Sequence, residues 1–114
     1  MGYVASFTQR PEPAMTEVEA GSGWQLLEFG TDWCGHCQAA QPEVQRFADA
    51  HALVHRKVED GRGRPLGRAF RVKLWPTLVL LRDGKEQGRV VRPTRAEDLA
   101  PLVQALAEQG PAGG

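Results

Sequence analysis

The sequence contains very little cysteine: Cys34 and Cys37 are the only two in 114 residues. Two cysteines form at most one disulfide, so a hydrophobic core must supply the stability that several disulfides give small secreted scaffolds. No apolar run reaches about eighteen residues, so the sequence predicts no transmembrane helix. The N-terminus lacks the basic-then-apolar pattern of a secretory signal. We therefore expect a cytoplasmic location; the alternative is an exported domain whose signal is absent from this sequence.

The sequence also lacks an excess of charge of either sign, because 14 Lys and Arg balance 14 Asp and Glu. This balance argues against a dedicated nucleic-acid binder. Four arginines lie close together in the sequence: Arg62, Arg64, Arg68 and Arg71. We interpret them as a solvated surface rather than as a docking site for an acidic partner. The length suits one monomeric domain. We expect it to span residues 1–109, followed by a disordered tail at residues 110–114.

What the sequence does contain is the motif Trp33-Cys34-Gly35-His36-Cys37, in which two residues separate the cysteines. One turn of helix would bring the two sulfurs onto one side. The first turn of a helix has unpaired N–H groups and a positive dipole end, so a thiolate at Cys34 would be stabilised there. The thiolate is the form that attacks disulfides. The motif predicts a dithiol that cycles between reduced and oxidised states.

Hydrophobic periodicity predicts strands and helices in alternation. The expected strands are 3–8, 24–30, 53–58, 78–81 and 86–91. The expected helices are 15–20, 38–50 with Pro42 inside it, 66–70, and a last helix opened by a Thr94–Glu97 capping box. Pro101 conflicts with a helix that starts at Arg95 and would fit better if Asp98 were the cap, so the start of that last helix stays open. Alternation predicts parallel strands with helices on both faces, and the Asp83-Gly84 turn predicts a final antiparallel hairpin.

These features resemble the thioredoxin superfamily over nearly the whole chain, from about Tyr3 to Leu106. The strand at 24–30 runs directly into the dithiol, and Pro42 falls where the family has a kink-forming proline. Trp75-Pro76-Thr77 resembles the family's cis-proline loop. The resemblance implies an α/β thioredoxin fold, with a central mixed sheet of about four or five strands and helices on both faces.

Gly35-His36 between the cysteines resembles the corresponding pair of protein disulfide isomerase domains. Glu28 falls where thioredoxin carries a buried acid and the isomerases carry a glutamate. Two positions depart from the family pattern. Trp75 precedes the proline where a small or aliphatic residue is more frequent, and Arg92-Pro93 replaces a glycine that many thioredoxins have after the final strand. The resemblance therefore implies dithiol–disulfide chemistry, but it does not imply which proteins the domain binds.

The resemblance implies a thiol–disulfide oxidoreductase in which Cys34 is the nucleophile and Cys37 the resolving thiol. His36 would favour the Cys34 thiolate. A carboxylate inside a core strand is costly to ionise, which indicates a function for Glu28. We expect Glu28 to accept the proton of Cys37, or to form a salt bridge with Lys57 or Arg56 on the neighbouring strand; the two interpretations overlap.

Five residues are expected to bind an extended protein substrate: Trp33, Gly35, Trp75, Pro76 and Thr77. The expected partners are protein disulfide substrates and a redox partner, either a reductase or a membrane thiol carrier. No metal or organic cofactor is expected. The alternative is a thioredoxin-like scaffold or dedicated redox carrier without general reductase activity.

A zinc site is a further alternative, because Cys34, Cys37, His51 and His55 fall inside the spacing of a Cys2His2 finger. One continuous helix between the two pairs would hold them roughly 20 Å apart at 1.5 Å per residue, which disfavours this alternative. The haem-attachment pattern C-x-x-C-H is absent, since Gln38 follows Cys37.

Overall fold

A computed structural model describes residues 3–7 and 13–109. The sheet has four strands in the order β2-β1-β3-β4. The elements along the chain are α1 (Met15–Ala20), β1 (Trp24–Gly30), α2 (Gly35–Ala50), β2 (Val54–Glu59), α3 (Pro65–Ala69), β3 (Thr77–Arg82), β4 (Lys85–Val91), a 3-10 turn (Ala96–Leu99) and α4 (Ala100–Gln109). Strand β2 is parallel to β1, whereas β3 and β4 are antiparallel to their neighbours. The predicted α/β fold with a mixed sheet is confirmed.

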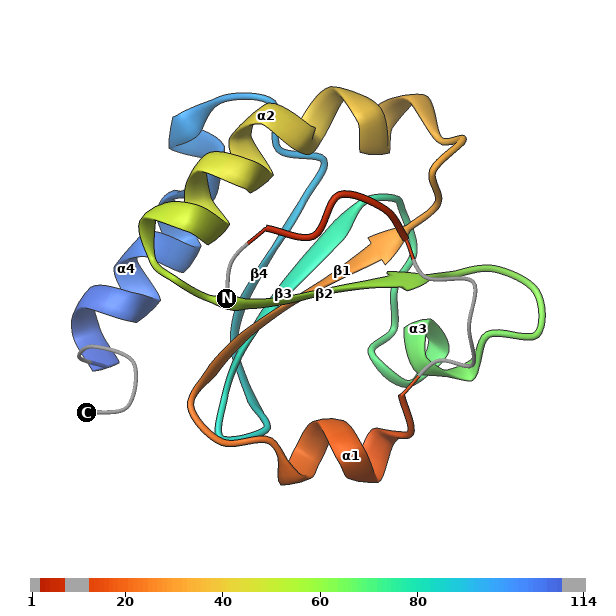
Figure 1. Cartoon of the computed structure of the whole chain (residues 1–114), viewed down its shortest axis with the longest axis horizontal. Coiled ribbons are helices and arrows are strands. Elements are labelled where there is room, and N and C mark those ends of the chain that lie inside the picture. The colour runs from red at the N-terminus through yellow and green to blue at the C-terminus, as the bar shows by residue number, and fades with distance from the viewer. Residues whose placement is uncertain (1–2, 8–12, 110–114) are drawn as a thin grey trace.

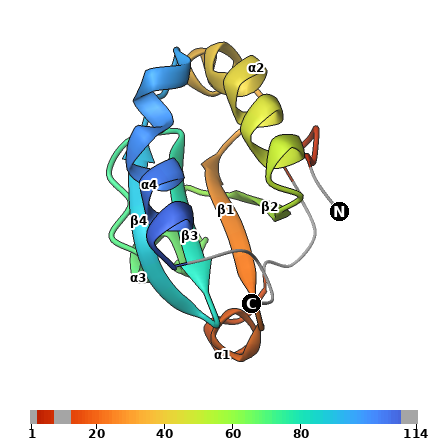
Figure 2. The same cartoon turned by 90° about the vertical axis from the view of Figure 1, so that its left-hand side faces the viewer.

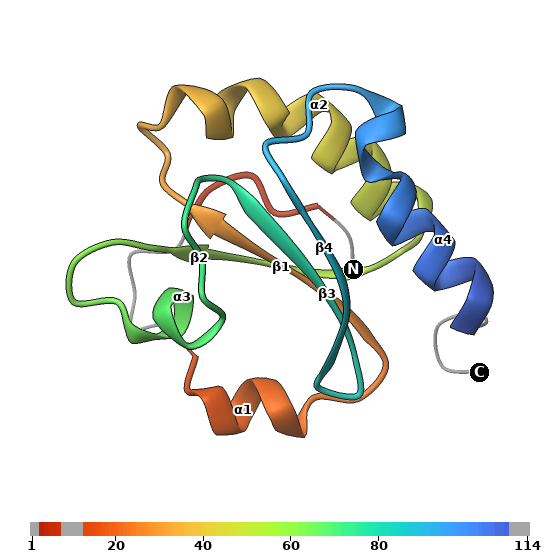
Figure 3. The ribbon, with the colours of Figure 1, turned by 180° about the vertical axis from the view of Figure 1, so that it is seen from behind.

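Helices cover both faces of this sheet. Figures 1 and 2 show α2 and α1 on opposite sides of the strands, and the view from behind shows α4 on the side of α2 (Figure 3). Every residue of β1 is buried, because neighbouring side chains point to opposite faces of the sheet and helices cover both faces. Leu26 packs in the core beneath α2 and α4, while Leu27 and Phe29 pack in the core that faces α1 and α3.

The dithiol lies where β1 ends and α2 begins, so the first strand delivers both cysteines to one edge of the sheet. Pro42 lies inside α2, as the sequence predicts. The β3–β4 hairpin turns at Asp83 and Gly84, which have φ values of 52° and 80°. Two positive φ values are the requirement of the tight hairpin that an Asp-Gly pair predicts.

The strand predicted at residues 3–8 is wrong for the part that the structure describes. Residues 3–7 form no ladder; they run alongside β2 beneath α2 and are held by side chains (Figure 1). We call residues 3–7 the N-terminal strap. Hydrophobic content alone cannot distinguish such an extended strap from a strand, because the difference lies in which partner its N–H groups find.

The predicted Thr94–Glu97 capping box is also wrong. The carboxylate of Asp98 accepts from the backbone N–H of Thr94 at 3.0 Å and of Arg95 at 3.1 Å. These bonds lower the pKa of Asp98. The 3-10 turn ends at Leu99 and α4 begins at Ala100, so Pro101 lies in the first turn of that helix. Proline is tolerated there because N–H groups of the first turn have no partner within the helix.

Residues 110–114, predicted to be a disordered tail, lie outside the described residues, as do residues 1–2 and 8–12. Over residues 3–7 and 13–109, none of the helices has the length and apolar character needed to cross a bilayer.

Candidate active site

The sulfur of Cys34 caps the N-terminus of α2. Cys34 is the N-cap residue, and its Sγ accepts a hydrogen bond from the backbone N–H of Cys37 at 3.4 Å. An acceptor at this position satisfies one of the free N–H groups, and the helix dipole favours negative charge there. Cys34 is partly exposed and Cys37 is buried, and both thiols are reduced. The two cysteines therefore have different access to a substrate.

Burial is the main influence on Cys37, which is 1% exposed. It raises the pKa of the Cys37 thiol from 9.0 to about 12, although a hydrogen bond from the Thr31 backbone acts in the opposite direction. A neutral thiol is a poor nucleophile. Cys37 therefore needs a base that removes its proton before it can attack. A cavity of about 160 Å³ adjoins Cys37, large enough for water, and is lined in part by Asp32 and Lys57.

Glu28 is fully buried and both of its carboxylate oxygens are hydrogen-bonded. Gln41 Nε2 donates to Glu28 Oε2 at 2.8 Å and also to the Cys37 carbonyl at 2.7 Å. His55 Nε2 lies 2.9 Å from Glu28 Oε1. Gln41 thus links the acid directly to the backbone of the buried cysteine.

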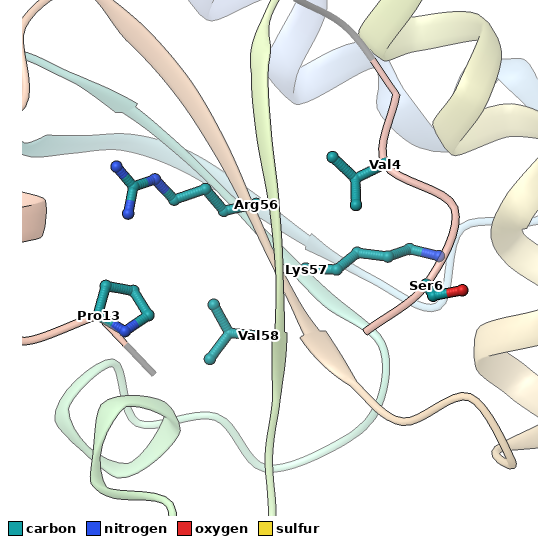
Figure 4. Close-up of a pocket in the computed structure, with 6 residues that line it drawn as sticks. All are labelled: Val4, Ser6, Pro13, Arg56, Lys57 and Val58. Atoms are coloured by element: carbon teal, nitrogen blue, oxygen red, sulfur yellow. The ribbon is translucent and has the colours of Figure 1, made fainter. Parts of the chain in front are cut away.

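The predicted partners of Glu28 are wrong: it pairs with His55, not with Lys57 or Arg56. Figure 4 shows Arg56 and Lys57 leaving β2 on opposite sides, around a pocket of about 270 Å³. Arg56 is directed away from Glu28 by the alternation of the strand. Lys57 lies opposite Glu28 in the register, but its ammonium donates to the carbonyl of Ala5 in the strap at 2.7 Å.

The sequence motifs do not indicate that His55 and the strap lie beside Glu28. The signal for His55 was available, because positions 55 and 57 of one strand face the same side as Glu28 on the parallel neighbour. The strap contacts had no local signal. Val4 meets His55 across 51 positions in the chain, and Tyr3 meets Gln41 across 38.

Two tryptophans form the exposed rim beside the dithiol. Trp33 is 74% exposed, and its ring meets Trp75 edge to face at a centroid distance of 5.8 Å. The indole N–H of Trp75 donates to Asp60 Oδ2 at 2.8 Å, which fixes the ring. The Trp75–Pro76 peptide bond is cis. Trp24, by contrast, belongs to the core.

The other predicted site residues differ in their access to solvent. Gly35 and His36 are exposed in the first turn of α2, and within the described chain the His36 side chain makes no hydrogen bond. Thr77 is buried and its hydroxyl donates to the Leu74 carbonyl at 2.7 Å, so this side chain holds the loop and is not presented at the surface. Arg92 Nε donates to the Trp75 carbonyl at 2.8 Å.

The geometry does not support the zinc alternative. Both ring nitrogens of His55 are occupied, by Glu28 and by the Val4 N–H, while His51 caps the far end of α2. In the described parts of the chain, no three His, Cys, Asp or Glu residues gather as a metal site would require.

A helix-capping thiol with a buried thiol one turn later, on an α/β fold, defines the class of thiol–disulfide exchange domains. Comparisons with known proteins agree. The thioredoxin family model matches residues 9–105. The solved structure of reduced thioredoxin 2 from Pseudomonas aeruginosa is 51% identical, with a TM-score of 0.78, and the match covers 93% of this chain and 98% of that one.

Two curated relatives extend the comparison. A protein disulfide-isomerase of Hordeum vulgare is 34% identical over 96 residues, and thioredoxin-2 of Pyricularia oryzae is 31% identical over 82 residues. These matches cover 76% and 71% of this chain. The chain spans only 18% of the isomerase and 45% of that thioredoxin.

The chain belongs to the thioredoxin family, and Cys34 and Cys37 are the dithiol of a thioredoxin-type thiol–disulfide oxidoreductase.

Proposed function

We propose that the protein reduces or exchanges disulfides of other proteins in two steps. Cys34, the accessible thiol, attacks a substrate disulfide and forms a mixed disulfide while one substrate sulfur leaves as a thiolate. Cys37 then attacks Cys34, which forms the Cys34–Cys37 disulfide and releases the second substrate sulfur. The observation that carries this order is the unequal access of the two thiols at the start of α2.

Glu28 is proposed to be the proton acceptor for Cys37. The support is that burial keeps Cys37 protonated near neutral pH, and that Gln41 joins the Glu28 carboxylate to the Cys37 carbonyl. Transfer to a positioned base contributes typically about 10²–10⁴-fold to such a step. His36 is proposed to favour the Cys34 thiolate from its exposed place in the first turn of α2. That would stabilise the reduced form and make the disulfide more oxidising.

Substrate is proposed to dock on the rim formed by Trp33, Gly35, Trp75 and Pro76, with Thr77 fixing the loop beneath them. The exposed indole of Trp33 gives this rim a flat apolar surface. Thioredoxins interact with reductases and with disulfide substrates. We expect this protein to act as a cytoplasmic monomer that is reduced again by a reductase or a membrane thiol carrier.

Insulin reduction tests the proposal. The reduced protein with dithiothreitol should accelerate the precipitation of insulin B chain, and Cys34→Ser should abolish the acceleration. Equal activity in both proteins would contradict the assignment of Cys34. Absence of activity in both would favour the scaffold or dedicated carrier and would overturn general disulfide reduction.

A further inference from the structure

Among the described residues, the two-step scheme leaves the buried titratable side chains of His55 and Lys57 without a task, and of these two His55 is the one that contacts Glu28. Its side chain is completely inaccessible to solvent. Nε2 lies 2.9 Å from Glu28 Oε1, and Nδ1 accepts the backbone N–H of Val4 at 2.8 Å. A strap residue, a β2 histidine and a β1 carboxylate therefore form one continuous hydrogen-bonded chain.

The Val4 N–H determines which ring nitrogen of His55 carries the hydrogen. A backbone N–H can only donate, so Nδ1 must present its lone pair to Val4. In the neutral ring the hydrogen then lies on Nε2, and Nε2–H donates to Glu28 Oε1. Gln41 donates to the other carboxylate oxygen. The carboxylate is held from two directions by donors that belong to β2 and α2.

The strap also fixes the plane of the imidazole. The ring of Tyr3 stacks on His55 at a centroid distance of 5.4 Å, and the Tyr3 hydroxyl donates to Gln41 Oε1 at 2.6 Å. Lys57, the charged residue next to His55 on this face of β2, is engaged by the Ala5 carbonyl. Residues 3–5 thus contact His55 and Gln41, the two donors to Glu28, and they bind the Lys57 ammonium that lies next to this pair.

We propose that His55 is a positioning residue for the second step, held by the strap in the tautomer that donates to Glu28. The proposal rests on the proposed role of Glu28 as the proton acceptor. In this step the Cys37 proton moves to Glu28, the Cys37 sulfur bonds to Cys34, and the substrate sulfur leaves with the electrons of the broken S–S bond. His55 exchanges no proton; it keeps the carboxylate oriented.

Stopped-flow reaction of the reduced full chain with 5,5′-dithiobis(2-nitrobenzoate) separates the two steps, because each releases one coloured thiolate. The first release reports attack by Cys34, and the second reports resolution by Cys37. His55→Leu removes both hydrogen bonds of the ring. His55→Gln is the matched control, since an amide can accept from Val4 and donate to Glu28. Glu28→Gln tests the acceptor itself.

We expect His55→Leu to slow the second release about tenfold while the first stays within twofold, because misplacing a catalytic group costs rate without removing it. His55→Gln should restore most of the rate. Glu28→Gln should slow the second release about 100-fold. A second release in His55→Leu within twofold of wild type, or equal slowing in His55→Gln, overturns the positioning role. A fast second release in Glu28→Gln overturns the proton acceptor instead.

Val4→Pro provides a variant that keeps the His55 side chain, because proline removes the backbone N–H that faces Nδ1, although its ring also fixes φ at position 4. Val4→Ala is its control. The ¹⁵N chemical shifts of the imidazole should show a hydrogen on Nε2 alone in wild type and Val4→Ala, and a mixture of tautomers in Val4→Pro. A hydrogen on Nδ1 in the wild type would contradict the proposal even if the leucine variant failed to fold.

Discussion

The backbone of Gly30 lies directly against the sulfur of Cys37, so closely that a Cβ atom at position 30 would overlap Cys37 Sγ and press on the ring of Phe7. Glycine is therefore required at the end of β1 by lack of space. The close approach is what allows the resolving thiol to be buried under the loop that carries Cys34.

Gly30→Ala should consequently destabilise the reduced protein by about 1–3 kcal/mol, the usual cost of overpacking a core. Urea denaturation followed by far-UV circular dichroism would measure the change. Gly35→Ala is the matched control, because a Cβ at that position would meet no described atom within 4 Å apart from its chain neighbours and the backbone of its own helix. We expect Gly35→Ala to be as stable as wild type or more so; equal losses in the two variants would contradict the packing argument.

The pH dependence of stability should report the burial of Cys37. Burial raises the pKa of this thiol from 9.0 to about 12. Between these values the folded state holds a proton that the unfolded state has lost, so stability falls as pH rises. The contribution is complete below about pH 9 and disappears toward about pH 12.

Urea unfolding of the reduced protein near pH 8 and near pH 10 would measure this loss. Cys37→Ala is the control, since it lacks the thiol but keeps the other titrating groups. We expect wild type to lose more stability than Cys37→Ala over that interval. Equal losses would mean that the Cys37 thiol titrates alike in the folded and unfolded states.

The position of Trp75 in the rim depends on its hydrogen bond to Asp60. Trp75 Nε1 donates to the Asp60 carboxylate, and a hydrogen bond to a charged acceptor contributes about 1.5–3 kcal/mol. Asp60→Ala should raise the KM for a protein disulfide several-fold and leave kcat nearly unchanged, because the docking surface loosens while the dithiol is untouched. Asp60→Asn retains an accepting oxygen and should resemble wild type. A fall in kcat alone would place Asp60 in the chemistry rather than in docking.

Arg92 combines a strained backbone with a stabilising contact. Its φ is 53°, a value that favours glycine, while its Nε donates to the Trp75 carbonyl at 2.8 Å. Arg92→Ala loses the hydrogen bond and keeps the strain, whereas Arg92→Gly loses both. The glycine variant should be more stable than the alanine variant by about 1 kcal/mol. Thermal unfolding of both proteins tests this, and an equal or lower stability of Arg92→Gly would contradict it.

Much of the fold could be predicted because its signals are local. The apolar run at 24–30 marks a strand buried on both faces, and Asp83-Gly84 supplies the two residues that tolerate positive φ in the hairpin. The strap is one of the exceptions. Its residues are apolar enough for a strand, but their N–H groups bind side chains of Asp49, His55 and Asp32 instead of another strand.

The sequence predicts the part of the site that lies in the cysteine motif and in the strand before it. Cys34 and Cys37 lie where helix-capping chemistry requires, and Glu28 lies in the core as the apolar strand around it indicates. The pairing of Glu28 with His55 depends on the register of β1 against β2 and on a strap folded back from the N-terminus. Neither is a property of a short segment, so only the assembled structure shows them.

Trapping of the mixed disulfide tests the central claim most directly. Each single-cysteine variant would be reduced and mixed with a protein disulfide substrate, and mass spectrometry of the proteolysed adduct would locate the bond. We predict a lasting adduct on Cys34 in Cys37→Ala, little or no adduct on the buried Cys37 in Cys34→Ala, and rapid release in the wild type. Equal trapping on both cysteines, or release from Cys37→Ala as fast as from wild type, would contradict the account.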